Sequence, residues 1–163
     1  MTQWGHLTSR FLLPEKKEVM HAYFSHSLYS LYDSFYLEKV CEQFRLRGKK
    51  IQITYGGRYF LDQNAKNLAK NDCSKVVYFA QDTPFPKEGY ALVLCGDYFI
   101  EVIEPELFKK AVGKLFGSIK NLDQLDAKAL KHLFESKMPC EIKVTRNKTK
   151  AKALEKLFLS FYE

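Results

Sequence analysis

The sequence predicts an α+β protein with a mixed or mostly antiparallel sheet, packed against a long N-terminal helix and three C-terminal helices. Segments rich in β-branched and aromatic residues occupy the middle of the chain, and segments with helical spacing of apolar residues lie on both sides of them. The chain has 163 residues, 46% of them hydrophobic and 28% charged, which is enough to bury one sizeable core. We therefore expect residues 1–163 to form a single domain.

The long helix is expected to run from Pro14 to about Leu46, with a possible break at residues 25–27. Proline and the acidic residues after it suit a first helical turn, and Gly48 supplies a stop. Apolar side chains recur at helical spacing in two adjoining rows, which are Leu28, Leu31 and Phe35 in the first and Tyr29, Tyr32, Tyr36, Val40 and Phe44 in the second. Two rows are wider than one amphipathic stripe, so the Leu, Phe and Val positions of both rows are predicted to lie in the core.

Strands are expected in the middle of the chain. Residues 49–61, KKIQITYGGRYFL, alternate around a Gly-Gly pair and predict two short strands or one strand with a bulge. DQNAKNLAKND follows with helical spacing and Asp62 as its cap, and KVVYFA (75–80) is predicted to be a buried strand. The clearest hairpin is YALVLCGDYFIEVIE (90–104), with its turn near Gly96 and Asp97.

Three helices and one strand are predicted after the hairpin. Pro105 opens the helix PELFKKAVGKLFG, whose apolar side is predicted to carry Leu107, Phe108, Ala111, Val112, Leu115 and Phe116. Asp123 is predicted to cap the helix DQLDAKALKHLFESK. CEIKVT (140–145) predicts a strand, and NKTKAKALEKLFLSFYE predicts a terminal amphipathic helix with an inward face formed by Leu154, Leu157, Phe158 and Phe161.

The cysteines and the N-terminus favour a cytoplasmic protein. MTQWGHLTSRFLLPEKK lacks the basic stretch and apolar run of a secretory signal, and no apolar stretch is long enough for a membrane span. Four cysteines, Cys41, Cys73, Cys95 and Cys140, are widely spaced without a CxxC pair, so we expect reduced core thiols and neither a metal nor another cofactor.

The net charge of +7 is concentrated in the last third of the chain. Residues 109–163 contain 13 Lys and Arg against six Asp and Glu, whereas residues 61–108 contain four against eight. A basic region of this kind favours a polyanionic or acidic partner.

A basic cluster at the C-terminus is the strongest candidate for a binding site. Its members are Lys143, Arg146, Lys148, Lys150, Lys152 and Lys156. On a helix, Lys148, Lys152 and Lys156 would form one charged stripe opposite the apolar face, suited to phosphate contacts or simply solvated. The chain has 21 Lys but five Arg, which disfavours bidentate base recognition. The first hypothesis is therefore a non-enzymatic module that binds nucleic acid or another polyanion.

Two alternatives remain open from the sequence. Tyr29, Tyr32 and Tyr36 could form either the rim of the core or a contact surface for a protein partner. The second hypothesis is therefore an adaptor, inhibitor or immunity-type protein that uses the tyrosine row or the acidic middle third of the chain. Glu141-x-Lys143 has the spacing used by metal-dependent nucleases, with Asp97, Glu101 or Asp126 as the second carboxylate; Asp97, Glu141 and Lys143 are weak catalytic candidates. His6, His21, His26 and His132 are scattered, and Gly56-Gly57-Arg58 is interpreted as a turn.

Overall fold

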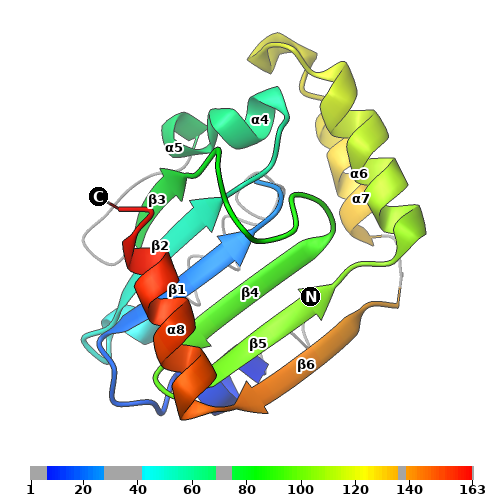
Figure 1. Cartoon of the computed structure of the whole chain (residues 1–163). Coiled ribbons are helices and arrows are strands. Elements are labelled where there is room, and N and C mark those ends of the chain that lie inside the picture. The colour runs from blue at the N-terminus through cyan, green and yellow to red at the C-terminus, as the bar shows by residue number, and fades with distance from the viewer. Residues whose placement is uncertain (1–6, 28–41, 69–74, 136–138, 163) are drawn as a thin grey trace.

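The fold is described from a computed structural model, in which residues 7–27, 42–68, 75–135 and 139–162 are placed. It is α+β with a six-stranded mixed sheet in the order β3-β2-β1-β4-β5-β6 (Figure 1). The strands are β1 (Val19–Phe24), β2 (Lys50–Tyr55), β3 (Lys75–Phe79), β4 (Tyr90–Cys95), β5 (Tyr98–Ile103) and β6 (Glu141–Arg146). β1, β2 and β3 are parallel to one another, and β4, β5 and β6 continue the sheet antiparallel from β1.

The predicted long N-terminal helix is wrong. Val19–Phe24 forms β1, a central strand whose last five residues are buried. Before it, the described chain contains only the short π-helix η1 (Thr8–Leu12). Both faces of β1 are covered by other parts of the protein, so its apolar run carries no alternation that would separate it from a buried helix. The apolar positions 28, 31 and 35 lie outside the described residues, whereas Phe44 is buried.

The predicted glycine stop is confirmed. Helical residues end at Arg45, Gly48 adopts a φ of 67°, and the Lys49 amide donates to the Phe44 carbonyl (2.9 Å). The Gly48 amide also donates to the Arg45 carbonyl (2.9 Å), so the pair of hydrogen bonds forms a Schellman motif. This motif ends the helical residues directly before β2.

The segment after β2 also differs from prediction. β2 is followed by a Gly-Gly loop and two short helices, α4 (Phe60–Gln63) and α5 (Ala65–Leu68), so no second strand forms there. The helical spacing predicted for DQNAKNLAKND is confirmed as far as residue 68, and residues 69–72 lie outside the described residues. Asp62 is not the N-cap but a buried residue in the first turn of α4, where its side chain accepts from the amide of the N-cap residue Tyr59. By contrast, the predicted strand at 75–80 and the hairpin at 90–104 are confirmed as β3 and β4–β5, and Gly96 takes the positive φ of 61° that the hairpin turn requires.

The C-terminal helices α6 (Glu106–Ser118), α7 (Ala127–Glu135) and α8 (Lys148–Leu159) form, but they do not pack on the sheet as a group. α6 and α7 pack with α4 around Leu61, Val112, Phe116 and Leu130, in a cluster that contains no strand residue. Only α8 lies across the sheet, as Figure 1 shows. The predicted packing of three C-terminal helices against the sheet is therefore wrong.

Two finer predictions about these helices are also wrong. The side chain that caps α7 is Asp126, whose Oδ1 accepts from the amides of Lys128 (2.8 Å) and Ala129 (3.1 Å), and not Asp123. Leu107, predicted on the apolar side of α6, is 74% exposed.

Two layers of side chains cover the sheet. One face carries the larger cluster, which includes Leu12, Ile53, Tyr55, Val77, Val93 and Ile100. The opposite face carries Tyr23, Leu92, Leu94 and Phe99, which pack against Ala151 and Phe158 of α8. Of the predicted core thiols, Cys95 is buried, Cys140 is exposed, and Cys41 and Cys73 lie outside the described residues.

Candidate functional site

Helix α8 is fixed to the sheet by its cap and by its apolar face. The Asn147 side chain accepts a hydrogen bond from the Lys150 amide (2.9 Å), which caps the helix N-terminus. Ala151 and Phe158 are 1% and 0% exposed, and Leu154 and Leu157 pack beside them. The terminal helix and this inward face were predicted from the sequence and are confirmed.

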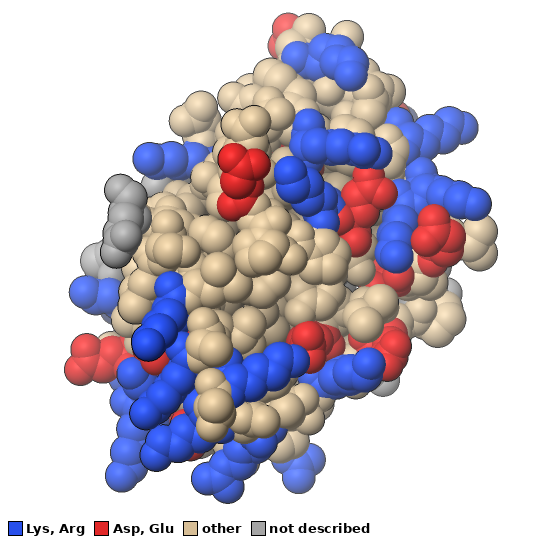
Figure 2. Space-filling model, in the orientation of Figure 1, with Lys and Arg blue, Asp and Glu red and all other residues tan. Residues whose placement is uncertain are grey.

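The opposite face of α8 carries Lys148, Lys152 and Lys156, which we call the basic stripe. All three residues are exposed, and none forms an ion pair with another residue of the described chain. At 1.5 Å per residue, successive lysines of the stripe are about 6 Å apart along the helix axis. Figure 2 shows Lys and Arg side chains gathered over the N-terminal end of α8 and a second group over α6.

The other three members of the predicted basic cluster have partners within the protein. Lys143 Nζ lies 2.9 Å from Glu141 Oε1, a contact that raises the pKa of Lys143. Lys150 Nζ lies 3.7 Å from Glu101 Oε2 and 4.7 Å from the centre of the Phe99 ring. Arg146 lies over the ring of Tyr98, 5.4 Å from its centre. The predicted cluster therefore divides into a stripe on α8 and a group that interacts with the sheet.

Of the weak catalytic candidates, Glu141 and Lys143 are in contact, but Asp97 does not lie with them. Asp97 lies in the β4–β5 turn, and its neighbour Tyr98 pairs with Arg146 at one end of β6, whereas Glu141 lies at the other end. Five strand positions correspond to about 16 Å. Glu101 stands across from Lys143 in the β5–β6 register, but its Oε1 accepts from the Tyr90 hydroxyl (2.8 Å). Within the described residues, no group of three or more His, Cys, Asp or Glu is arranged to bind a metal.

The tyrosine surface stays a prediction, because Tyr29, Tyr32 and Tyr36 lie outside the described residues. Among the residues that are described, no helix has the length and apolarity to cross a membrane.

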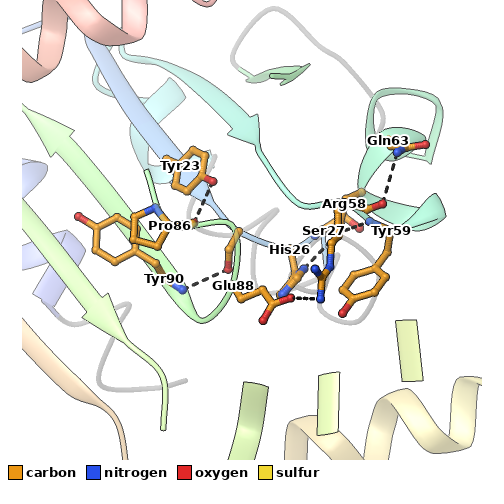
Figure 3. A network of polar contacts seen from close by, with 11 residues as sticks. Tyr23, His26, Ser27, Arg58, Tyr59, Gln63, Pro86, Glu88 and Tyr90 are labelled. Carbon is orange, nitrogen blue, oxygen red and sulfur yellow. Dashed lines mark hydrogen bonds and ion pairs between the residues drawn. The ribbon is translucent and has the colours of Figure 1, made fainter. Parts of the chain in front are cut away.

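The sequence did not predict a polar network at the ends of the parallel strands β1 and β2, shown in Figure 3. Asp62 is fully buried, and its Oδ1 accepts from the Ser27 amide (2.7 Å). Its Oδ2 lies 3.1 Å from Nδ1 of His26, which is 4% exposed, and accepts from the Tyr59 amide (3.3 Å). We call His26, Ser27, Tyr59 and Asp62 the strand-end network. One carboxylate thereby joins the loop after β1 to the loop after β2.

Two glycines allow the loops of this network to approach each other. A Cβ at Gly57 would lie 2.0 Å from Asp62 Oδ2 and 2.3 Å from the Ser25 carbonyl oxygen. A Cβ at Gly56 would lie 2.3 Å from the Tyr23 hydroxyl. Residues 56–58, which were predicted to form a turn, form an irregular loop that contacts the strand-end network. The Gly-Gly pair is the sequence signal that indicates this contact.

We interpret the strand-end network as a structural element, because its polar groups are buried. A histidine oriented by a carboxylate can activate a hydroxyl nucleophile, and the buried Ser27 hydroxyl forms no hydrogen bond with a described residue. However, His26, Ser27 and Asp62 are all almost completely inaccessible to solvent. The ion pair between Arg58 and Glu88 (2.6 Å), also drawn in Figure 3, is accessible to solvent, with side chains 66% and 40% exposed.

A second buried histidine lies under the C-terminal residues. His21 is 3% exposed, stacks on Phe158 and Tyr162, and places Nδ1 3.4 Å from the Tyr162 hydroxyl. Burial lowers the pKa of His21 to about 4, although Glu155 opposes this shift. The imidazole is therefore neutral at pH 7.

These features define an α+β protein with a mixed sheet and an exposed basic helix. In comparisons with known proteins, no family matches the chain, and no curated protein or solved structure is significantly similar to it.

Proposed function

We propose that the protein is a non-enzymatic module that binds the phosphate backbone of nucleic acid through Lys148, Lys152 and Lys156. The observation that carries this proposal is the basic stripe itself. Its three ammonium groups are exposed at regular spacing on a helix whose other face is anchored in the core, and no carboxylate of the described chain pairs with them.

Unpaired ammonium groups favour a polyanion because each phosphate that they neutralise releases condensed counterions. Lysines that already lie beside a carboxylate contribute less, since binding phosphate would disrupt an existing ion pair. For this reason Lys143 and Lys150 are peripheral in the proposal, although they belong to the same basic region of the sequence.

Lysine contacts of this kind position a nucleic acid without reading its bases. An ammonium group lacks the planar fork with which arginine recognises guanine, and Arg146 lies against Tyr98. We therefore expect similar affinities for duplexes of different sequence.

Charge reversal tests the stripe. Lys148→Glu, Lys152→Glu and Lys156→Glu together are expected to weaken binding to a labelled DNA duplex at least about tenfold at roughly 50 mM salt, as measured by fluorescence anisotropy. A matched control reverses Lys110, Lys114 and Lys120, which are also exposed and lie on or directly after α6. The two variants have the same net charge.

The control separates a binding surface from a general effect of charge. An equal loss of affinity in both variants would contradict the proposal, because net charge alone would then account for it. No loss in the α8 variant would identify the basic stripe as a solvated helix face.

A further inference from the structure

β6 is the last strand of the described sheet, and all its residues are exposed or half-buried. It pairs with β5, and no strand of the described chain pairs with its other side. The Asn147 amide donates to the Asp97 carbonyl (3.0 Å), so the backbone at position 147 faces β5. In an antiparallel ladder this direction alternates, so positions 141, 143 and 145 also face β5. The backbone groups of Ile142, Val144 and Arg146 therefore point outward.

We propose that a second copy of the chain pairs with this edge, β6 against β6, antiparallel and with a two-fold axis at Ile142. Such an interface is isologous, since the same strand serves both copies. Ile142 of one copy then stands across from Ile142 of the other, and Val144 stands across from Cys140. Residues that face each other across the pair lie on the same side of the joined sheet.

Several registers would let the outward backbone groups of two β6 strands pair, and they differ in the position of the two-fold axis. The charges on β6 favour the register with the axis at Ile142. With the axis at Ile142, Lys143 of each copy faces Glu141 of the other, so two opposite-charge pairs form. With the axis at Lys143, two ammonium groups would face each other. With the axis at Val144, Lys143 would face Thr145 and gain no partner charge. Opposite charges directly across a strand pair stabilise it and like charges destabilise it.

The existing environment of Lys143 suits the same arrangement. Lys143 stands across from Glu101 of β5 and lies 2.9 Å from Glu141 on its own strand. In the joined sheet, each row across the centre would read Glu101 and Lys143 of one copy, followed by Glu141 and Ile103 of the other. Charged residues usually protect an edge strand from pairing. On β6, Lys143 and Glu141 disfavour the register with the axis at Lys143 and favour the register with the axis at Ile142.

Two single charge reversals test the pairing. Lys143→Glu places two carboxylates opposite each other, and Glu141→Lys places two ammonium groups opposite each other, so each variant alone is expected to be monomeric. An equimolar mixture of the two variants restores both opposite-charge pairs and is expected to form a heterodimer. The intrachain contact between positions 141 and 143 is lost in both variants and is not restored by mixing. Restoration on mixing therefore reports pairing between copies.

The oligomeric state is measured by sedimentation equilibrium, with circular dichroism to show that each variant is folded. The proposal predicts a concentration-dependent dimer for the wild type and for the mixture. A wild type that remains monomeric up to about 1 mM, the range of very weak association, would overturn it. A mixture that remains monomeric when the wild type is a dimer would also overturn it.

A cross-link tests the register with the native thiol of Cys140. Residues of a hydrogen-bonded antiparallel pair have Cα atoms about 5.5 Å apart, within the range that a disulfide spans. Under mild oxidation, Val144→Cys is expected to give a covalent dimer linked to Cys140 of the other copy. Positions 140 and 144 of one strand are about 13 Å apart and cannot bond to each other.

Arg146→Cys is the matched control for this cross-link. In the proposed register no cysteine stands across from position 146, so the variant should not cross-link to Cys140. Cross-linking by Arg146→Cys but not by Val144→Cys would place the axis at Lys143 and contradict the proposal, as would a link to Cys140 in neither variant.

Discussion

The basic stripe of α8 and the strand-end network are the two polar regions on which this account rests, and they differ in exposure and pairing. Lys148, Lys152 and Lys156 are exposed without a charged partner among the described residues, while Asp62 is fully buried with three donors around it. Exposed charges contribute little to stability but remain free to bind a ligand, whereas removal of one member of a buried, hydrogen-bonded polar group is strongly destabilising. Substitutions in the basic stripe should therefore reduce binding and leave stability nearly unchanged, whereas substitutions in the strand-end network should reduce stability.

The largest expected loss of stability follows from a substitution in the strand-end network. Asp62→Ala removes the acceptor of the Ser27 and Tyr59 amides and of the His26 ring, and it is expected to lower the free energy of unfolding by about 3 to 5 kcal/mol. Urea denaturation measures the change.

The exposed ion pair in the same loops is the control for Asp62. Arg58→Ala breaks the contact with Glu88 and should cost less than about 1 kcal/mol. If Asp62→Ala costs no more than Arg58→Ala, the strand-end network does not stabilise the fold.

The second effect is a pH dependence of stability that results from the burial of His21. The unfolded chain has the ordinary histidine pKa of 6.5, whereas burial lowers the pKa of His21 to about 4 in the folded protein. The unfolded state therefore binds the proton more readily between these values, and stability falls as the pH is lowered from 6.5 towards 4. The full shift corresponds to about 3 kcal/mol.

Replacing the histidine isolates this contribution. The loss of stability between pH 6.5 and 4 should be smaller in His21→Phe than in the wild type, as measured by thermal or urea unfolding across the range. Parallel pH profiles for the two proteins would show that His21 is not the group that titrates.

The third effect concerns the close approach of the two loops. Gly57→Ala would place a methyl group against Asp62 and the Ser25 carbonyl, and it is expected to cost about 1 to 3 kcal/mol. Gly117→Ala is the matched control, because a Cβ there meets its nearest neighbour at 3.6 Å and α6 gains a better helix former. A Gly57→Ala variant as stable as Gly117→Ala would contradict the contact geometry.

Much of the sheet could be predicted because its hairpin and β3 are rich in β-branched and aromatic residues between clear turns. β1 could not. Its residues are buried on both faces, and apolar spacing at positions 28–44 extended a helical interpretation backwards across it.

The two polar regions also differ in how far the sequence predicts them. The basic stripe follows from a spacing of four residues within one helix, which the sequence displays directly. The strand-end network depends on the parallel pairing of β1 with β2, which brings residues 26 and 62 together across a connection that the sequence does not specify. The contact of Lys150 with Glu101 depends likewise on the position of α8 against β5, whereas Glu141, the partner of Lys143, lies two residues before it on the same strand.

The most direct test of the basic stripe is the salt dependence of nucleic-acid binding by the wild-type protein. Three lysine–phosphate contacts on duplex DNA predict that log affinity falls linearly with log salt concentration, with a slope of about −3. The slope is obtained by titrating a labelled duplex between roughly 50 and 200 mM salt. A slope near −3 that becomes close to zero when the three lysines are reversed is the predicted result. Absence of binding at the lowest salt concentration, or an affinity independent of salt, would contradict the account.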